Sequence, residues 1–109
     1  MATFVGLWAT TRYTGNDPEN PESIQLSISE DADPNSLDGA YSRPGPNARM
    51  FGALEGNGVL WRASIDERDS TGDEGTAVFF ISGDGNTIYG AWSSNQHNNG
   101  PQPWYGTRI

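Results

Sequence analysis

The sequence contains no cysteine and no lysine. Without cysteine, the chain has no disulfide, no thiolate nucleophile and no cysteine-based metal site. All six of its cationic side chains are arginines, and they face fourteen acidic residues, so the formal net charge is −8. A chain this acidic repels phosphate backbones and anionic membrane surfaces. We therefore expect neither nucleic acid nor a membrane as a partner.

Long apolar segments are also missing. The longest apolar run, AVFFI at residues 77–81, is too short to cross a bilayer. The first residues, MAT, lack the basic and apolar regions of a secretory signal, so we expect a cytoplasmic protein. Only 34% of the residues are hydrophobic, and the core must therefore be small and rich in aromatic side chains.

Fourteen glycines and seven prolines favour short strands separated by turns. Eight segments alternate with a period of two: 4–13, 23–30, 36–43, 48–55, 59–68, 75–82, 87–93 and 104–109. EGNG before Val59 and GDGN before Thr87 indicate tight hairpin turns, because Gly and Asn tolerate positive φ. No gap is long enough for a crossover helix, so consecutive strands should be antiparallel.

Eight short sequential strands leave two unprotected edges unless the sheet closes. The sequence therefore predicts one domain over residues 1–109, an all-β, eight-stranded antiparallel up-and-down barrel. A two-sheet β-sandwich is the alternative, because the same pattern fits it. In the barrel the first and last strands would pair.

Gly6-x-Trp8 in the first strand, together with Arg108 in the last, resembles the signature of the calycins, a superfamily that includes the lipocalins and avidins. The resemblance implies that Trp8 closes one barrel end and that Arg108 packs across its indole. The stretch DGAYSR is similar to the avidin Gly-Thr-Tyr stretch, with Tyr41 on the matching tyrosine. Thr10 and Arg43 stand where avidins have asparagine and serine, which argues against biotin as the ligand.

Strand parity suggests a polar cluster inside the barrel. If Trp8 points inward, Thr10 and Arg12 do so too, and an inward Tyr41 brings Arg43 with it. Two such arginines either form a clamp for a carboxylate or phosphate, or lie at the barrel mouth paired with acidic side chains.

A set of aromatic residues either lines a ligand cavity or fills the core: Trp61, Phe80, Trp92 and Trp104. We expect no metal and no cofactor. His97 is the single histidine, and the calcium-like spacing from Asp31 fails at Ser36 and Ser42.

The function expected first is the binding of a small organic ligand in the barrel mouth, an anionic one if the arginines contact it. The residues expected to bind it are Thr10, Arg12, Tyr41, Arg43, Trp61, Phe80, Trp92 and Trp104. One alternative is a barrel-type cyclase or isomerase of a hydrophobic metabolite, with Tyr41 or an aspartate as acid or base. Another is a carbohydrate-binding lectin that uses the loop at residues 95–102.

The sixth segment also predicts self-association, as a homodimer or a higher homo-oligomer. Val78 and Phe80 lie on one face of it, and Phe79 and Ile81 lie on the other. One small barrel can bury only one of these faces, and an exposed apolar patch commonly marks an interface.

Overall fold

The structure, a computed structural model, describes residues 3–13, 19, 21–42, 47–67, 73–94 and 101–109. Its eight strands are β1 Gly6–Arg12, β2 Glu22–Glu30, β3 Ser36–Ser42, β4 Asn47–Glu55, β5 Leu60–Glu67, β6 Asp73–Ile81, β7 Thr87–Ser94 and β8 Gln102–Arg108. A short 3₁₀ turn, η1 Gly56–Gly58, joins β4 to β5. The predicted strands are confirmed, with ends that differ by one or two residues.

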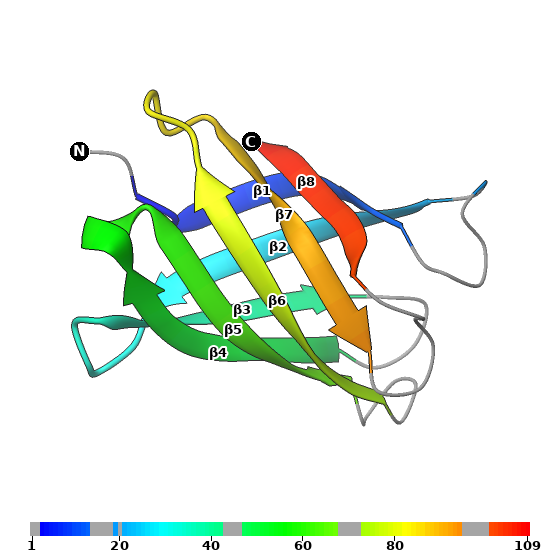
Figure 1. Cartoon of the computed structure of the whole chain (residues 1–109), viewed down its shortest axis with the longest axis horizontal. Helices are drawn as coiled ribbons and strands as arrows, with labels where there is room; N and C mark the ends of the chain where they lie inside the picture. Colours follow the sequence, from blue (N-terminus) through cyan, green and yellow to red (C-terminus); the bar gives the residue numbers. More distant parts are fainter. Residues whose placement is uncertain (1–2, 14–18, 20, 43–46, 68–72, 95–100) are drawn as a thin grey trace.

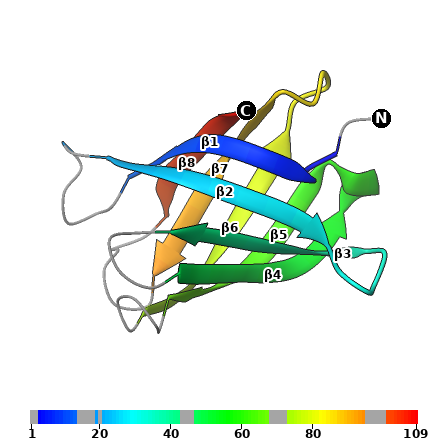
Figure 2. The ribbon, with the colours of Figure 1, turned by 180° about the vertical axis from the view of Figure 1, so that it is seen from behind.

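The sheet is a closed barrel in the order β1 to β8, and every neighbouring pair is antiparallel. Closure occurs where β1 pairs with β8, with Trp8 opposite Arg108 and Arg12 opposite Trp104. Figures 1 and 2 show these two strands side by side from both directions. The predicted up-and-down barrel is therefore confirmed over the sandwich, because pairing of the terminal strands removes both free sheet edges.

The two barrel ends differ in their connections. At the end that we call the turn end, short turns join β2 to β3, β4 to β5, and β6 to β7. Positive φ angles occur in two of these turns, at Gly56, Asn57, Gly58 and Gly85, as EGNG and GDGN predicted. At the opposite end, which we call the loop end, β1, β3, β5 and β7 finish and β2, β4, β6 and β8 begin (Figure 1).

A column of aromatic rings fills the barrel along its axis. Neighbouring ring centroids lie 5.1–6.5 Å apart. The column begins with Phe4 at the turn end and continues through Trp61, Phe79 and Trp104 to Tyr41 and Trp92 at the loop end. All six side chains are buried. Large rings thus supply the burial that the small number of aliphatic residues does not.

Glycines make room for this column. Gly39 lies under the indole of Trp61, which a Cβ at this position would approach to 3.0 Å. Gly39 lies on β3, two residues before Tyr41, and its lack of a side chain lets the Trp61 ring from β5 lie across its backbone.

Within the described part of the chain, no helix has the length and apolar character needed to cross a membrane.

Candidate functional site

The turn end is closed by Trp8 and Arg108. The Arg108 guanidinium carbon lies 4.2 Å from the centroid of the Trp8 ring, which confirms the contact that the sequence predicted. Arg108 also donates hydrogen bonds to the carbonyl oxygens of Val5 at 2.8 Å, Gly85 at 3.0 Å and Thr3. Arg108 therefore binds backbone carbonyl groups from two parts of the chain, the segment before β1 and the β6–β7 turn, and covers this end of the core.

The position of Gly6, beside this contact, favours glycine because of its backbone angle and the nearby Arg108 side chain. Its φ is +140°, a value that side-chain-bearing residues rarely adopt, and a Cβ would lie 2.5 Å from Nη1 of Arg108. The Gly-x-Trp pattern therefore marks a place where the backbone must leave space for an arginine from the last strand. In the described part of the chain, Trp8 and Arg108 occupy this end of the core.

At the loop end, the alternation of β1 places Thr10 and Arg12 inside the barrel, as predicted. Thr10 is 4% exposed and Arg12 is fully buried. The charge of Arg12 therefore lies in the low-dielectric interior, where it must be compensated by charges, hydrogen bonds or aromatic faces.

Three aromatic rings surround the Arg12 guanidinium. Its central carbon lies 4.1 Å from the ring centroid of Trp92, 4.9 Å from that of Trp104 and 5.4 Å from that of Tyr41. The faces of aromatic rings carry negative potential and attract cations, most strongly where water is excluded. These residues come from β1, β3, β7 and β8, and we refer to them, together with Thr10, as the loop-end cluster.

Arg12 also makes polar contacts with described residues. Nη1 donates to the Tyr41 hydroxyl at 3.2 Å, and Nη2 lies 3.5 Å from Oε1 of Glu22. Glu22 is directly opposite Arg12 in the β1–β2 pairing, and its side chain is 24% exposed. The ion pair is long, and its carboxylate partner is open to water on one side.

Hydrogen bonds fix the aromatic rings. The Trp104 indole donates to Oγ1 of Thr10 at 2.9 Å, and Thr10 in turn donates to the Ile24 carbonyl at 2.6 Å. The Trp92 indole donates to the Tyr13 carbonyl at 2.7 Å. The cation is thus placed among rings whose orientations are already set, which is the preorganisation that a binding site needs.

Two predicted site residues lie away from this cluster. Trp61 packs between Phe4 and Phe79 nearer the turn end. Phe80 is 41% exposed, and it points outward because Phe79 takes the inward position on β6. The expectation that Phe80 lines the interior is therefore wrong. Side chains alternate along a strand, and on β6 the inward position belongs to Phe79, one residue earlier.

The remaining predicted residue, Arg43, lies outside the described residues, and so do His97 and most of the proposed lectin loop. Glu22 was missed as a site residue. Its signal was the hairpin register, since a β1–β2 pairing that aligns Trp8 with Leu26 also aligns Arg12 with Glu22.

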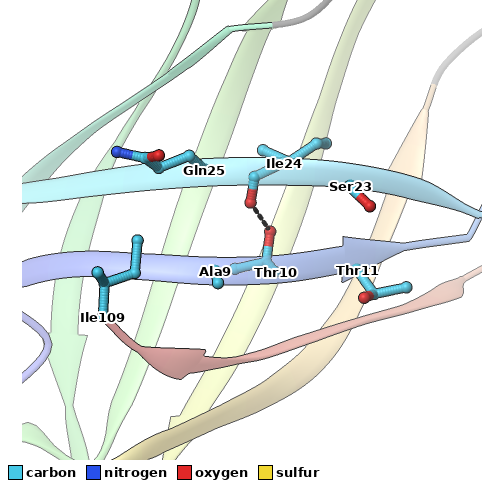
Figure 3. A pocket seen from close by; sticks show the side chains of 7 residues that line it. All are labelled: Ala9, Thr10, Thr11, Ser23, Ile24, Gln25 and Ile109. Carbon is cyan, nitrogen blue, oxygen red and sulfur yellow. Dashed lines mark hydrogen bonds between the residues drawn. The ribbon is translucent and has the colours of Figure 1, made fainter.

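A hollow also lies on the outer surface of the barrel. This hollow, of about 420 Å³, follows the seam between β1 and β2 near Ile109 (Figure 3). Its outward-pointing polar side chains are Thr11, Ser23 and Gln25, all of them neutral. Among the described residues, no group of three His, Asp or Glu side chains is placed to hold a metal ion.

Neither a protein-family model nor a curated protein matches this chain. The proposal for its function therefore rests on the fold and on the geometry of the loop-end cluster.

Proposed function

We propose that the protein is a calycin-like binding protein that holds a small organic anion at the loop end of its barrel. The observation that carries the proposal is the fully buried Arg12 guanidinium, enclosed by Trp92, Trp104 and Tyr41. A buried arginine contributes little to stability compared with an apolar side chain of similar size, and its use here supports a role in binding. The contact between Trp8 and Arg108 supports the calycin comparison.

The chemistry of the cluster selects the ligand class. An arginine presents a planar fork of donors that fits a carboxylate or phosphate. In the structure, Nη2 lies 3.5 Å from the carboxylate of Glu22, whose side chain is 24% exposed. An anionic group of the ligand would take the place of that carboxylate. Trp92 and Tyr41 would contact a flat apolar part of the same molecule.

The test is a titration of the protein with aromatic and aliphatic carboxylates and with inorganic phosphate, followed by tryptophan fluorescence. Trp92 and Trp104 lie against Arg12, so binding should change their emission. We expect a saturable response to at least one aromatic carboxylate. The absence of any saturable response in the whole panel would contradict the proposal.

Glu22→Gln is the informative variant, with Glu30→Gln as its control. Both remove one negative charge from β2, but Glu30 lies at the strand's other end and is exposed. If Glu22 competes with the ligand for Arg12, its removal should tighten binding about two- to fivefold, the value of one partly exposed ion pair. Glu30→Gln should leave the dissociation constant unchanged. Equal effects of the two variants would indicate only the loss of net charge.

Arg12→Gln should weaken anion binding about tenfold or more, because a charge-assisted hydrogen bond is lost. Near-ultraviolet circular dichroism would confirm that the aromatic packing survives.

The cyclase or isomerase and lectin alternatives stay predictions. The first would place Tyr41 as an acid or base in the same cluster, and turnover of a bound ligand would reveal it.

A further inference from the structure

The outer face of the barrel is divided by charge. The outward side chains of β3, β4 and β5 include charged residues along most of their length: Asp38, Arg49, Glu55, Arg62 and Asp66. Within the described residues, the outward side chains of β7, β8 and β1, and those of β6 from Thr76 onward, carry no charge. We call this second region the uncharged wall. The net charge of the chain is −8, yet three neighbouring strands and the adjoining part of β6 present no charged side chain on this outer surface.

A row of large rings crosses the uncharged wall. Phe80 is opposite Tyr89 in the β6–β7 pairing, and Tyr89 is opposite Tyr105 in the β7–β8 pairing. They are 41%, 53% and 42% exposed. The Phe80 and Tyr89 ring centroids lie 5.8 Å apart with an angle of 22° between the ring planes. Three exposed aromatic side chains therefore lie in one row across β6, β7 and β8, which we call the protrusion.

The same row leads directly into the outer hollow. Tyr105 is opposite Thr11 in the β8–β1 pairing, and Thr11 is opposite Ser23 in the β1–β2 pairing. Thr11 and Ser23 line the hollow of about 420 Å³, together with Ala9 and Gln25 (Figure 3). A protrusion and a neutral hollow thus lie two strands apart on one surface.

We infer that this surface is the contact between two copies of the chain, related by a two-fold axis near Tyr105. A two-fold interface needs a surface that is complementary to itself. Rotation about an axis between the two features places the rings of one copy, centred on Tyr89, over the Thr11 hollow of the other, and the reverse. Both contacts form together.

The charge of the protein favours a second copy as the occupant. Two molecules of net charge −8 repel each other, and they approach most closely through a face without charge. The Tyr105 phenol is neutral near pH 7, and the hydrogen bond with Tyr13 raises its pKa further above the ordinary value. In a closed barrel of eight strands, about three neighbouring strands face one partner, and at about 4.8 Å spacing and about seven residues each they present roughly 330 Å² of sheet face. This is less than the roughly 600 Å² per partner at the lower limit for stable interfaces, so we expect a weak dimer.

The structure decides which face of the sixth strand is available for the predicted self-association. The sequence leaves both faces of residues 76–82 open, and the structure places Phe79 and Ile81 in the core. The outer face is that of Val78 and Phe80, and Phe80 begins the aromatic row.

The test is the molar mass of the intact chain, measured by light scattering from roughly 1 μM to 1 mM, a range that covers weak and tight dimers. We expect two subunits at high concentration. Tyr89→Ser should weaken dimerisation at least tenfold. Phe51→Ser is the matched control, because Phe51 is 50% exposed on β4, outside the uncharged wall, and should leave the mass unchanged. A single-subunit mass throughout would overturn the inference, and so would equal effects of the two variants.

A charge exchange tests the pairing of protrusion and hollow. Tyr89→Arg and Thr11→Asp should each be monomeric, since each buries an unpaired charge twice in the dimer. Mixed in equal amounts, they should form a heterodimer with one Arg–Asp pair and one unchanged contact. Both positions point outward, and circular dichroism would confirm that each variant is folded. A mixture that stays monomeric, or single variants that still dimerise, would contradict the proposed arrangement.

Discussion

Arg108 joins backbone segments that are far apart in sequence. It stacks on Trp8 and donates to carbonyl groups before β1 and in the β6–β7 turn. Arg108→Ala should lower the free energy of unfolding by about 3 kcal/mol, because a cation–π contact and several charge-assisted hydrogen bonds are lost. Chemical denaturation measures this.

Arg62→Ala is the control for that change. Arg62 pairs with Glu55 at 2.8 Å, but both side chains are exposed, at 61% and 48%. Exposed pairs contribute little, so the loss should stay below about 1 kcal/mol. If the two variants were equally stable, the turn end would not depend on Arg108.

Asp84 gives the β6–β7 turn a dependence on pH. Its pKa is lowered, first by the hydrogen bond from the Ser82 hydroxyl at 2.6 Å and then by that from the Asn86 backbone amide at 3.0 Å. A carboxyl group with a lowered pKa in the folded state stabilises the protein above the ordinary aspartate value, about 3.9, and that contribution disappears as the pH falls through the folded-state pKa.

Asp84→Asn should therefore be less stable than the wild type near neutral pH, and the two should converge in acid. Melting temperatures measured from about pH 7 to pH 2.5 would show this, with the difference shrinking below about pH 4. Ser82→Ala removes the largest cause of the shift and should reduce the same pH dependence. A difference that stays constant down to pH 2.5 would contradict this role for Asp84.

At the scale of one element, β6 shows how parity decides the role of adjacent residues. Phe79 is fully buried in the aromatic column, and Phe80 is 41% exposed. Phe79→Ser should destabilise the monomer by about 4 kcal/mol or more, since it opens a cavity and buries a hydroxyl. Phe80→Ser should cost less than about 1 kcal/mol. Denaturation at low protein concentration, where a dimer dissociates, makes the comparison.

The sequence alone predicted the eight strands and their closure, because period-two alternation and turn residues are local signals. The contact between Trp8 and Arg108 was predicted from the resemblance of the Gly-x-Trp opening and the last-strand arginine to the calycins. It did not decide which face of β6 points inward, since residues 77–81 are apolar on both faces. That choice depends on the register with β5, where Trp61 is opposite Phe79. Glu22 was missed for the same reason, because its place beside Arg12 follows from strand pairing.

For the molecule as a whole, the ends and the wall of the barrel have separate roles. Arg108 closes the turn end, the uncharged wall is the proposed contact between copies, and the loop end holds Arg12. A barrel suits this division because its closed sheet holds the ends in fixed positions while side chains at each end differ.

The most direct measurement of anion binding at Arg12 is nuclear magnetic resonance of the arginine side-chain Nε–H groups. There are six arginines, and Arg12→Lys assigns the signal of Arg12. On titration with a carboxylate that changes tryptophan fluorescence, the Arg12 signal should shift saturably with the same dissociation constant, while that of exposed Arg62 stays in place. An unshifted Arg12 signal at saturation, or equal shifts of all arginine signals, would contradict a binding site at the loop end.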